Sequence, residues 1–176
     1  MVKIREETRI NKLKEGDLIS SIAISSAIES EDEKKIIEGL KIFRSWGLIS
    51  DKDNISCQRW GYLAGTDHTR FNLLHKTKAP LITFIRGGWG SARLLEESQP
   101  WEKGFVLGFS DITSILFSRL SKGFDGCIHG PMVTSIADEP EWSQNRLKNI
   151  LFGESIENLY GIPFRKGIAK GPLVAA

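Results

Sequence analysis

The stretch Phe105-Val106-Leu107-Gly108-Phe109-Ser110-Asp111-Ile112-Thr113 decides the fold expected for this chain. It opens with a short apolar run that is typical of a buried strand, and the apolar residues after Ser110 recur at helical spacing. A serine between a strand and a helix sits on a sharp turn, which pushes its hydroxyl out of the sheet. The next backbone N–H points into the same space, at the N-terminus of the helix. This arrangement is a nucleophile elbow.

A simpler interpretation fits the same residues. The usual elbow reads Gly-x-Ser-x-Gly, and here Ile112 occupies the fifth position. Serine is also a favoured helix N-cap, and Asp111 suits the first turn of a helix. Taken alone, this stretch favours a plain helix cap over a nucleophile.

Composition places the chain among ordinary soluble proteins. It has 176 residues, enough for one well-buried domain, of which 40% are hydrophobic and 26% charged, with a formal net charge of +2. The near balance of charge favours neither nucleic acid nor an anionic membrane as a partner. No signal peptide or membrane-spanning run is visible, and Cys57 and Cys127 match no metal or redox spacing. We therefore expect a cytoplasmic protein with no metal and no cofactor.

Strand and helix patterns alternate along the chain. Strands are expected over 17–24, 55–60, 81–85, 105–108 and 126–128, and helices over 31–46, 67–76, from residue 91, 110–122 and 139–151. Ser30-Glu31-Asp32-Glu33 predicts a capping box at the first helix. The alternation favours an α/β fold, a doubly wound and mainly parallel sheet with helices on both faces. The ligand crevice of such a sheet lies beyond the carboxyl ends of its strands.

A glycine-rich loop, Arg86-Gly87-Gly88-Trp89-Gly90, follows the expected strand 81–85 and falls at the same edge as Ser110. Such a loop admits two uses. It can bring a backbone N–H close to a reacting oxygen, because glycine has no side chain to block the approach. It can also cradle a phosphate, as in a flavodoxin-like nucleotide binder, although the spacing of the usual phosphate motifs is absent.

Five segments, in their order along the chain, resemble the LD-carboxypeptidase family, which includes the microcin-immunity-type serine peptidases. They are Leu13-Lys14-Glu15-Gly16-Asp17, Tyr62-Leu63-Ala64-Gly65-Thr66-Asp67 with Arg70 and Leu73, Arg86-Gly87-Gly88-Trp89-Gly90 with Arg93-Leu94-Leu95, Gly108-Phe109-Ser110-Asp111-Ile112-Thr113, and Gly130-Pro131-Met132. Glu15 stands where the family has proline. The ordered set covers nearly the whole chain. With this resemblance, the interpretation of Ser110 as a nucleophile is favoured over that of a plain helix cap.

The resemblance implies a short set of roles. Ser110 is the attacking hydroxyl, and the backbone N–H groups of Asp111 and Gly88 are the oxyanion donors, with Gly87 beside them. Arg86 either pairs with a substrate carboxylate or forms a structural salt bridge. Trp89 stands where the family usually has tyrosine, and it either walls the pocket or packs in the core.

The catalytic base is missing from this set. The chain has three histidines, and a structural role is favoured for His129, while His68 and His75 are expected at the surface or half-buried. The resemblance implies that the triad Glu and His come from a second domain beyond the segment 167–173. We therefore expect an N-terminal domain over 1–160, the start of a linker over 161–176, and little activity from this chain alone.

The expected function is that of the N-terminal half of a serine-type LD-carboxypeptidase, a hydrolase. It would cleave an amide bond next to a free carboxylate, in a cell-wall tetrapeptide during peptidoglycan recycling or in a related peptide conjugate. The expected partner is a small peptide or muropeptide, and a homodimer of the full-length form stays open. The alternatives are a truncated, non-catalytic peptide-binding module and, with less support, the nucleotide binder.

Overall fold

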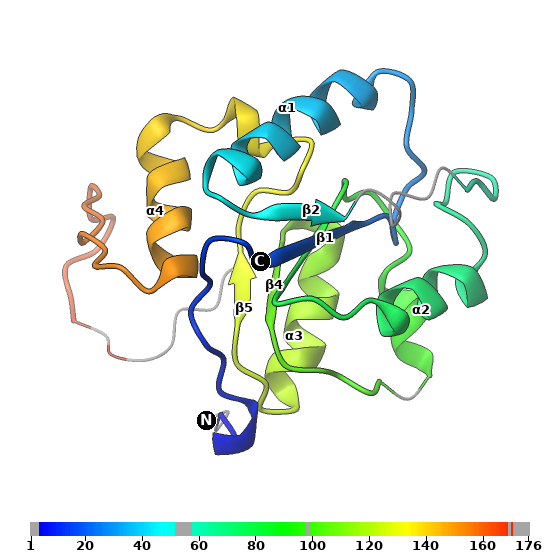
Figure 1. Ribbon diagram of the computed structural model, residues 1–176. Coiled ribbons are helices and arrows are strands. Elements are labelled where there is room, and N and C mark those ends of the chain that lie inside the picture. The colour runs from blue at the N-terminus through cyan, green and yellow to red at the C-terminus, as the bar shows by residue number, and fades with distance from the viewer. Residues whose placement is uncertain (1–3, 52–57, 98, 169, 171–176) are drawn as a thin grey trace.

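A five-stranded parallel sheet forms the centre of the protein (Figure 1). The computed structural model describes residues 4–51, 58–97, 99–168 and 170. The strands are β1 (Leu18–Ile22), β2 (Ile49–Asp51), β3 (Leu81–Phe84), β4 (Phe105–Gly108) and β5 (Cys127–His129). Their order is β2-β1-β3-β4-β5, and every pair is parallel. The order reverses between β1 and β3, which confirms the doubly wound α/β fold.

Helices cover both faces of this sheet. They are α1 (Asp32–Ser45), α2 (Asp67–Lys76), α3 (Thr113–Ser121) and α4 (Glu141–Phe152). The described chain also has four short 3-10 turns. They are η1 (Glu6–Thr8), which precedes β1, and η2 (Ala92–Glu96), η3 (Ser110–Ile112) and η4 (Ile136–Asp138). In Figure 1, α1 and α4 lie on one side of the strands, and α2 and α3 on the other.

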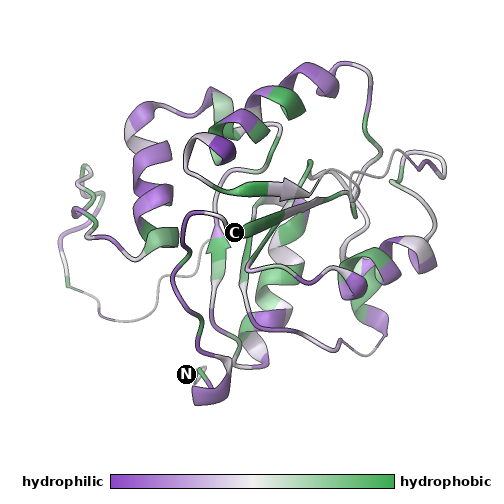
Figure 2. Cartoon of the chain, viewed as in Figure 1, coloured by the Kyte–Doolittle hydropathy of each residue, from purple (hydrophilic) through white to green (hydrophobic). Residues whose placement is uncertain are grey.

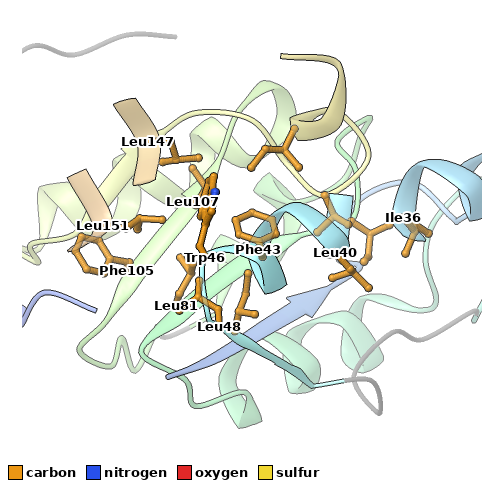
Figure 3. Packing of buried hydrophobic residues seen from close by; sticks show 14 of the residues in the cluster. Ile36, Leu40, Phe43, Trp46, Leu48, Leu81, Phe105, Leu107, Leu147 and Leu151 are labelled. Carbon is orange, nitrogen blue, oxygen red and sulfur yellow. The ribbon is translucent and has the colours of Figure 1, made fainter. Parts of the chain in front are cut away.

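Two apolar layers explain this division. On one face, α1 and α4 pack against β1, β3 and β4 around Phe43 and Trp46, whose rings meet edge to face with centroids 5.3 Å apart (Figure 3). On the other face, α2, η2 and α3 pack against the same strands around Phe84 and Ile112. All four residues of β4 are buried, as a strand covered on both faces requires. Apolar residues accordingly follow the sheet, while the outer faces of the helices are polar (Figure 2).

Most elements agree with the sequence pattern, but three predictions were wrong in detail. The second strand is Ile49–Asp51, at the edge of the sheet, and not the expected range 55–60. Residues 55–57 of that range lie outside the described part of the chain. The segment after Ser91 is a 3-10 turn. The capping box is absent, because α1 has no side-chain cap; instead, the Asp32 carboxylate accepts a hydrogen bond from the Glu29 N–H at 2.9 Å.

The chain leaves the packed layers after α4. Described residues 154–168 form no helix or strand, and several of their large apolar side chains are exposed. These are Ile156, Leu159, Tyr160, Ile162, Phe164 and Ile168. The domain boundary expected at residue 160 stays a prediction. Among the described residues, no helix is both long and apolar enough to cross a membrane.

Candidate active site

Ser110 lies at the turn between β4 and α3, with a backbone φ of 59°. No other non-glycine residue in the described part of the chain has a positive φ. A side chain in this left-handed region costs on the order of 1–3 kcal/mol, which the surrounding structure must offset. The Ser110 side chain is exposed and caps neither η3 nor α3. The plain helix-cap interpretation is therefore wrong, and the turn has the geometry of a nucleophile elbow.

Close packing around Gly108 explains how the elbow is held. A Cβ atom built on Gly108 would lie 2.7 Å from Cγ2 of Ile112 and 3.0 Å from a ring carbon of Phe84. Glycine is therefore required for α3 to begin so close to the end of β4. Ile112, at the position where the usual motif has a second glycine, is fully buried in the layer under the elbow.

The glycine-rich loop lies directly beside the serine. A Cβ atom on Gly87 would lie 3.1 Å from both Cβ and Oγ of Ser110. Gly88 has a φ of +118°, and a Cβ atom there would lie 2.0 Å from Oγ of Ser26. The Ser26 N–H donates to the Gly87 carbonyl at 3.3 Å, which fixes the loop to the chain that follows β1.

The Asp111 side chain joins three segments at this edge of the sheet. Its Oδ2 accepts hydrogen bonds from Ser25 Oγ at 2.6 Å and from the Ser91 N–H at 2.9 Å. Ser91 Oγ donates in return to the Asp111 carbonyl at 2.6 Å. Ser25 and Ser91 are both fully buried. The sequence pattern assigned the Asp111 side chain only to the helix terminus, and it missed both of these serines.

A signal for the missed serines exists in the sequence. Ser25-Ser26 follows the first apolar run, Leu18 to Ile24, and so had to emerge at the carboxyl edge of the sheet, where Ser110 was expected. Arg70, one of the residues that carried the family resemblance, is also fully buried here. It donates to the carbonyls of Ile24 and Gly90 and pairs with Asp67.

Arg86 and Trp89 flank the two glycines and have different surroundings. Arg86 Nη1 forms an ion pair with Asp32 Oδ2 at 2.8 Å, as one of its two interpretations requires. Asp32 begins α1, so the ion pair ties the loop to that helix. The Trp89 side chain is 74% exposed, so the interpretation that it packs in the core is wrong. Its place in a pocket wall stays a prediction.

In the described part of the chain, none of the three histidines is hydrogen-bonded to Ser110. Within the described residues, no hydrogen bond joins the Ser110 hydroxyl to another side chain. His129, at the end of β5, is exposed and lies edge-on to the Phe109 ring, with centroids 6.4 Å apart. His68 lies on α2 and hydrogen-bonds Asn72. His75, on the same helix, bonds Gln99 at 3.0 Å, and burial lowers its pKa below the ordinary value of 6.5.

A groove of about 400 Å³ opens beside the elbow. Phe109 and His129 line it at the strand ends, and Trp142 and Arg146 of α4 line its other wall. The groove therefore reaches Phe109, the residue before Ser110, on the side of the sheet where β5 ends, and Ser110 itself does not line it.

A strained, exposed serine at a strand-to-helix turn of a doubly wound sheet defines the nucleophile-elbow class of α/β domain. The family model of the LD-carboxypeptidase N-terminal domain matches residues 19–130. The chain belongs to this family.

Curated relatives agree with this assignment. The chain is 42% identical over 172 residues to "Putative carboxypeptidase slr1534" of Synechocystis sp., covering 93% of this chain and 56% of that protein. It is 29% identical over 167 residues to "Putative carboxypeptidase RC0549" of Rickettsia conorii, covering 85% of this chain and 52% of that protein. The chain therefore spans about half the length of these two relatives.

Solved structures share the fold. MccF in complex with glutamyl sulfamoyl guanosine superposes with a TM-score of 0.68 at 19% identity, covering 89% of this chain and 50% of that one. An MccF-like protein from Bacillus anthracis gives a TM-score of 0.64 at 22% identity, covering 81% of this chain and 46% of that one. At these identities the likeness concerns the fold alone.

Proposed function

We propose that Ser110 is the nucleophile of a serine-type LD-carboxypeptidase, to which this chain contributes the N-terminal domain. The observation that carries the proposal is the exposed, left-handed Ser110 at the elbow, with Gly87 packed against its side chain. A protein rarely keeps such strain on a serine that has no structural hydrogen bond to make. Membership of the family supports the proposed class of reaction, the hydrolysis of a peptide-like bond.

In this proposal, Ser110 Oγ attacks the carbonyl carbon of the scissile amide bond. The oxygen of the tetrahedral intermediate then accepts hydrogen bonds from the backbone N–H groups of Asp111 and Gly88. The contact between Gly87 and Ser110 supports this placement, because it brings the loop to the reacting hydroxyl. Removing one such donor typically costs about 2.7–4 kcal/mol of transition-state stabilisation.

The hydroxyl also needs a general base and a group to orient that base. We propose that this histidine and its glutamate lie outside the 176 residues. Two observations support the proposal: none of the three histidines hydrogen-bonds Ser110, and the chain spans about half the length of its curated relatives. On this view the chain alone holds the nucleophile beside its oxyanion donors and turns over little substrate.

The proposed substrate is a small peptide with a free carboxylate next to the scissile bond. A cytoplasmic muropeptide, whose terminal D-alanine would be released during peptidoglycan recycling, fits this description. A peptide–nucleotide conjugate is the second candidate, because the MccF structure with a similar fold holds glutamyl sulfamoyl guanosine. The groove lined by Phe109, the residue before Ser110, is a candidate place for part of either substrate.

The test is release of D-alanine from a muropeptide by the natural full-length protein and by its Ser110→Ala variant. We expect the variant to lose activity by several orders of magnitude. Ser121→Ala is the matched control, because it makes the same change at an exposed position of α3. Activity that survives in Ser110→Ala would overturn the proposal. A folded, inactive wild type that still binds the muropeptide would support the peptide-binding module instead.

A further inference from the structure

The elbow and the glycine-rich loop meet at one carboxylate. Asp111 Oδ2 accepts from Ser25 Oγ at 2.6 Å and from the Ser91 N–H at 2.9 Å. Ser25 lies three residues beyond the end of β1, and Ser91 directly follows Gly90, the last residue of the loop. Two separate chain segments are thus fastened to Asp111, the residue after Ser110.

The loop is held at both of its ends, at the far end by Asp111 itself and at the near end through Ser26, the neighbour of Ser25. At its far end, Ser91 is bound by Asp111 through its N–H and through its hydroxyl, which donates to the Asp111 carbonyl. At its near end, the Ser26 N–H holds the Gly87 carbonyl, and the Ser26 side chain fills the space beside Gly88. Ser26 is covalently next to Ser25, which Asp111 also binds.

We propose that the Asp111 carboxylate is a positioning residue that sets the distance between the two proposed oxyanion donors. One donor is the N–H of Asp111 itself, and the other is the N–H of Gly88 in the loop that the carboxylate fastens. This inference rests on the proposed function, because the two donors matter only if Ser110 attacks a carbonyl. The hydrogen bonds of the carboxylate go to Ser25 and Ser91 and not to the Ser110 hydroxyl, so its proposed role is to position other groups.

The hydrogen-bonding pattern predicts which substitutions are tolerated. Both groups that bind Oδ2 are donors, so one side-chain oxygen is enough to hold them. Asparagine has this oxygen in its amide, whereas alanine has none. Asp111→Asn should therefore keep the loop in place, and Asp111→Ala should release it. Ser25→Ala removes one of the two bonds and provides a milder variant in case Asp111→Ala does not fold.

Two measurements on the full-length protein test the proposal. The first is kcat and KM for a muropeptide, where we expect Asp111→Ala to lower kcat about 100-fold with a smaller change in KM. Asp111→Asn should stay within about fivefold of wild type, and Ser25→Ala should fall between the two. Thr83→Val is the control. It removes another buried hydrogen bond of the sheet, which Thr83 Oγ1 donates to the Leu107 carbonyl at 3.2 Å, and it leaves the contacts of the glycine-rich loop in place.

The second measurement does not depend on activity. Amide hydrogen exchange at Ser91 should accelerate in Asp111→Ala, because its N–H loses its acceptor, and stay slow in Asp111→Asn and Thr83→Val. The proposal is overturned if Asp111→Ala behaves like Thr83→Val in kcat, if Asp111→Asn is as impaired as Asp111→Ala, or if exchange at Ser91 does not change. Failure of the proposed function looks different, since wild type would then release no D-alanine although exchange at Ser91 responded as expected.

Discussion

Gly87 packs against Ser110 so closely that a methyl group on Gly87 would lie 3.1 Å from both side-chain atoms of the serine. Most real Cβ contacts are longer, so either the serine or the loop would have to move by a few tenths of an ångström. The φ of Gly87 lies outside the left-handed region, which means that alanine is acceptable to the backbone there. Space beside Ser110, and not backbone conformation, is therefore the reason for glycine at this position.

Gly87→Ala should accordingly impair catalysis more than stability. We expect kcat/KM to fall about tenfold or more, because a small displacement of a nucleophile is costly. The free energy of unfolding should change by less than about 1 kcal/mol, as Met132, the other neighbour of the new methyl group, has a flexible side chain. Activity assays and urea unfolding on the same preparations separate the two effects. Equal activity in the variant and wild type would contradict the contact.

Ser110→Gly should stabilise the protein and abolish its activity. Glycine adopts a φ of 59° without the steric cost that serine carries, so the variant should gain about 1 kcal/mol of unfolding free energy. Ser110→Ala removes the same hydroxyl but keeps the strained backbone, and it is the matched control. A Ser110→Gly variant no more stable than Ser110→Ala in urea unfolding would show that the elbow carries no strain.

The ion pair between Arg86 and Asp32 leads to a third expectation. The side chains are 32% and 10% exposed, so solvent screens the arginine in part. Arg86→Gln leaves the carboxylate without its cation and should cost about 1–2 kcal/mol of unfolding free energy. If Arg86 serves only the fold, KM for the muropeptide should stay near that of wild type. A KM that rises more than tenfold in Arg86→Gln, but not in Asp32→Asn, would assign Arg86 to the substrate carboxylate instead.

His75 should make the protein less stable in mild acid. Burial lowers its pKa in the folded state below 6.5, and the hydrogen bond with Gln99 opposes this only in part. As the pH falls below about 6.5, the unfolded chain takes up a proton that the folded chain does not, so the free energy of unfolding decreases. The loss continues until the pH reaches the lowered pKa of the folded state.

Urea unfolding between pH 7.5 and pH 5 measures this loss. His75→Gln should reduce the decline, whereas His68→Gln, which removes an exposed imidazole from the same helix, provides the comparison. A decline in His75→Gln as steep as that of wild type would assign the pH dependence to other groups.

The sequence predicted the elements that repeat a simple physical pattern. The largely apolar stretches that form β1, β3 and β4 are almost wholly buried, because helices cover both faces of these strands. The helix expected over 67–76 is α2, and it begins at a side-chain cap, because Thr66 Oγ1 accepts a hydrogen bond from the Thr69 N–H. The edge strand β2 was missed because three residues, one of them the 57% exposed Ile49, offer little periodicity.

The elbow could be located from the sequence, but the contacts that hold it could not. No local pattern connects Asp111 to Ser25, which lies 86 positions earlier in the chain, since only the strand order brings them together. The same holds for Arg86 and Asp32, which are 54 positions apart. The capping box failed for a related reason: Asp32 bonds Glu29 and Arg86, and α1 begins there without a side-chain cap.

The wide sequence separation of the groups around Asp111 has a consequence for the order of events during folding. Ser25, Ser91 and Asp111 meet only when β1, β3 and β4 have all paired, and closing loops of this length is among the slower steps of folding. Until then, nothing compensates the left-handed backbone of Ser110, which relaxes to an ordinary conformation. A half-folded or newly synthesised chain therefore lacks the left-handed Ser110 turn, and the proposed nucleophile takes its final geometry only with the last tertiary contacts of the domain.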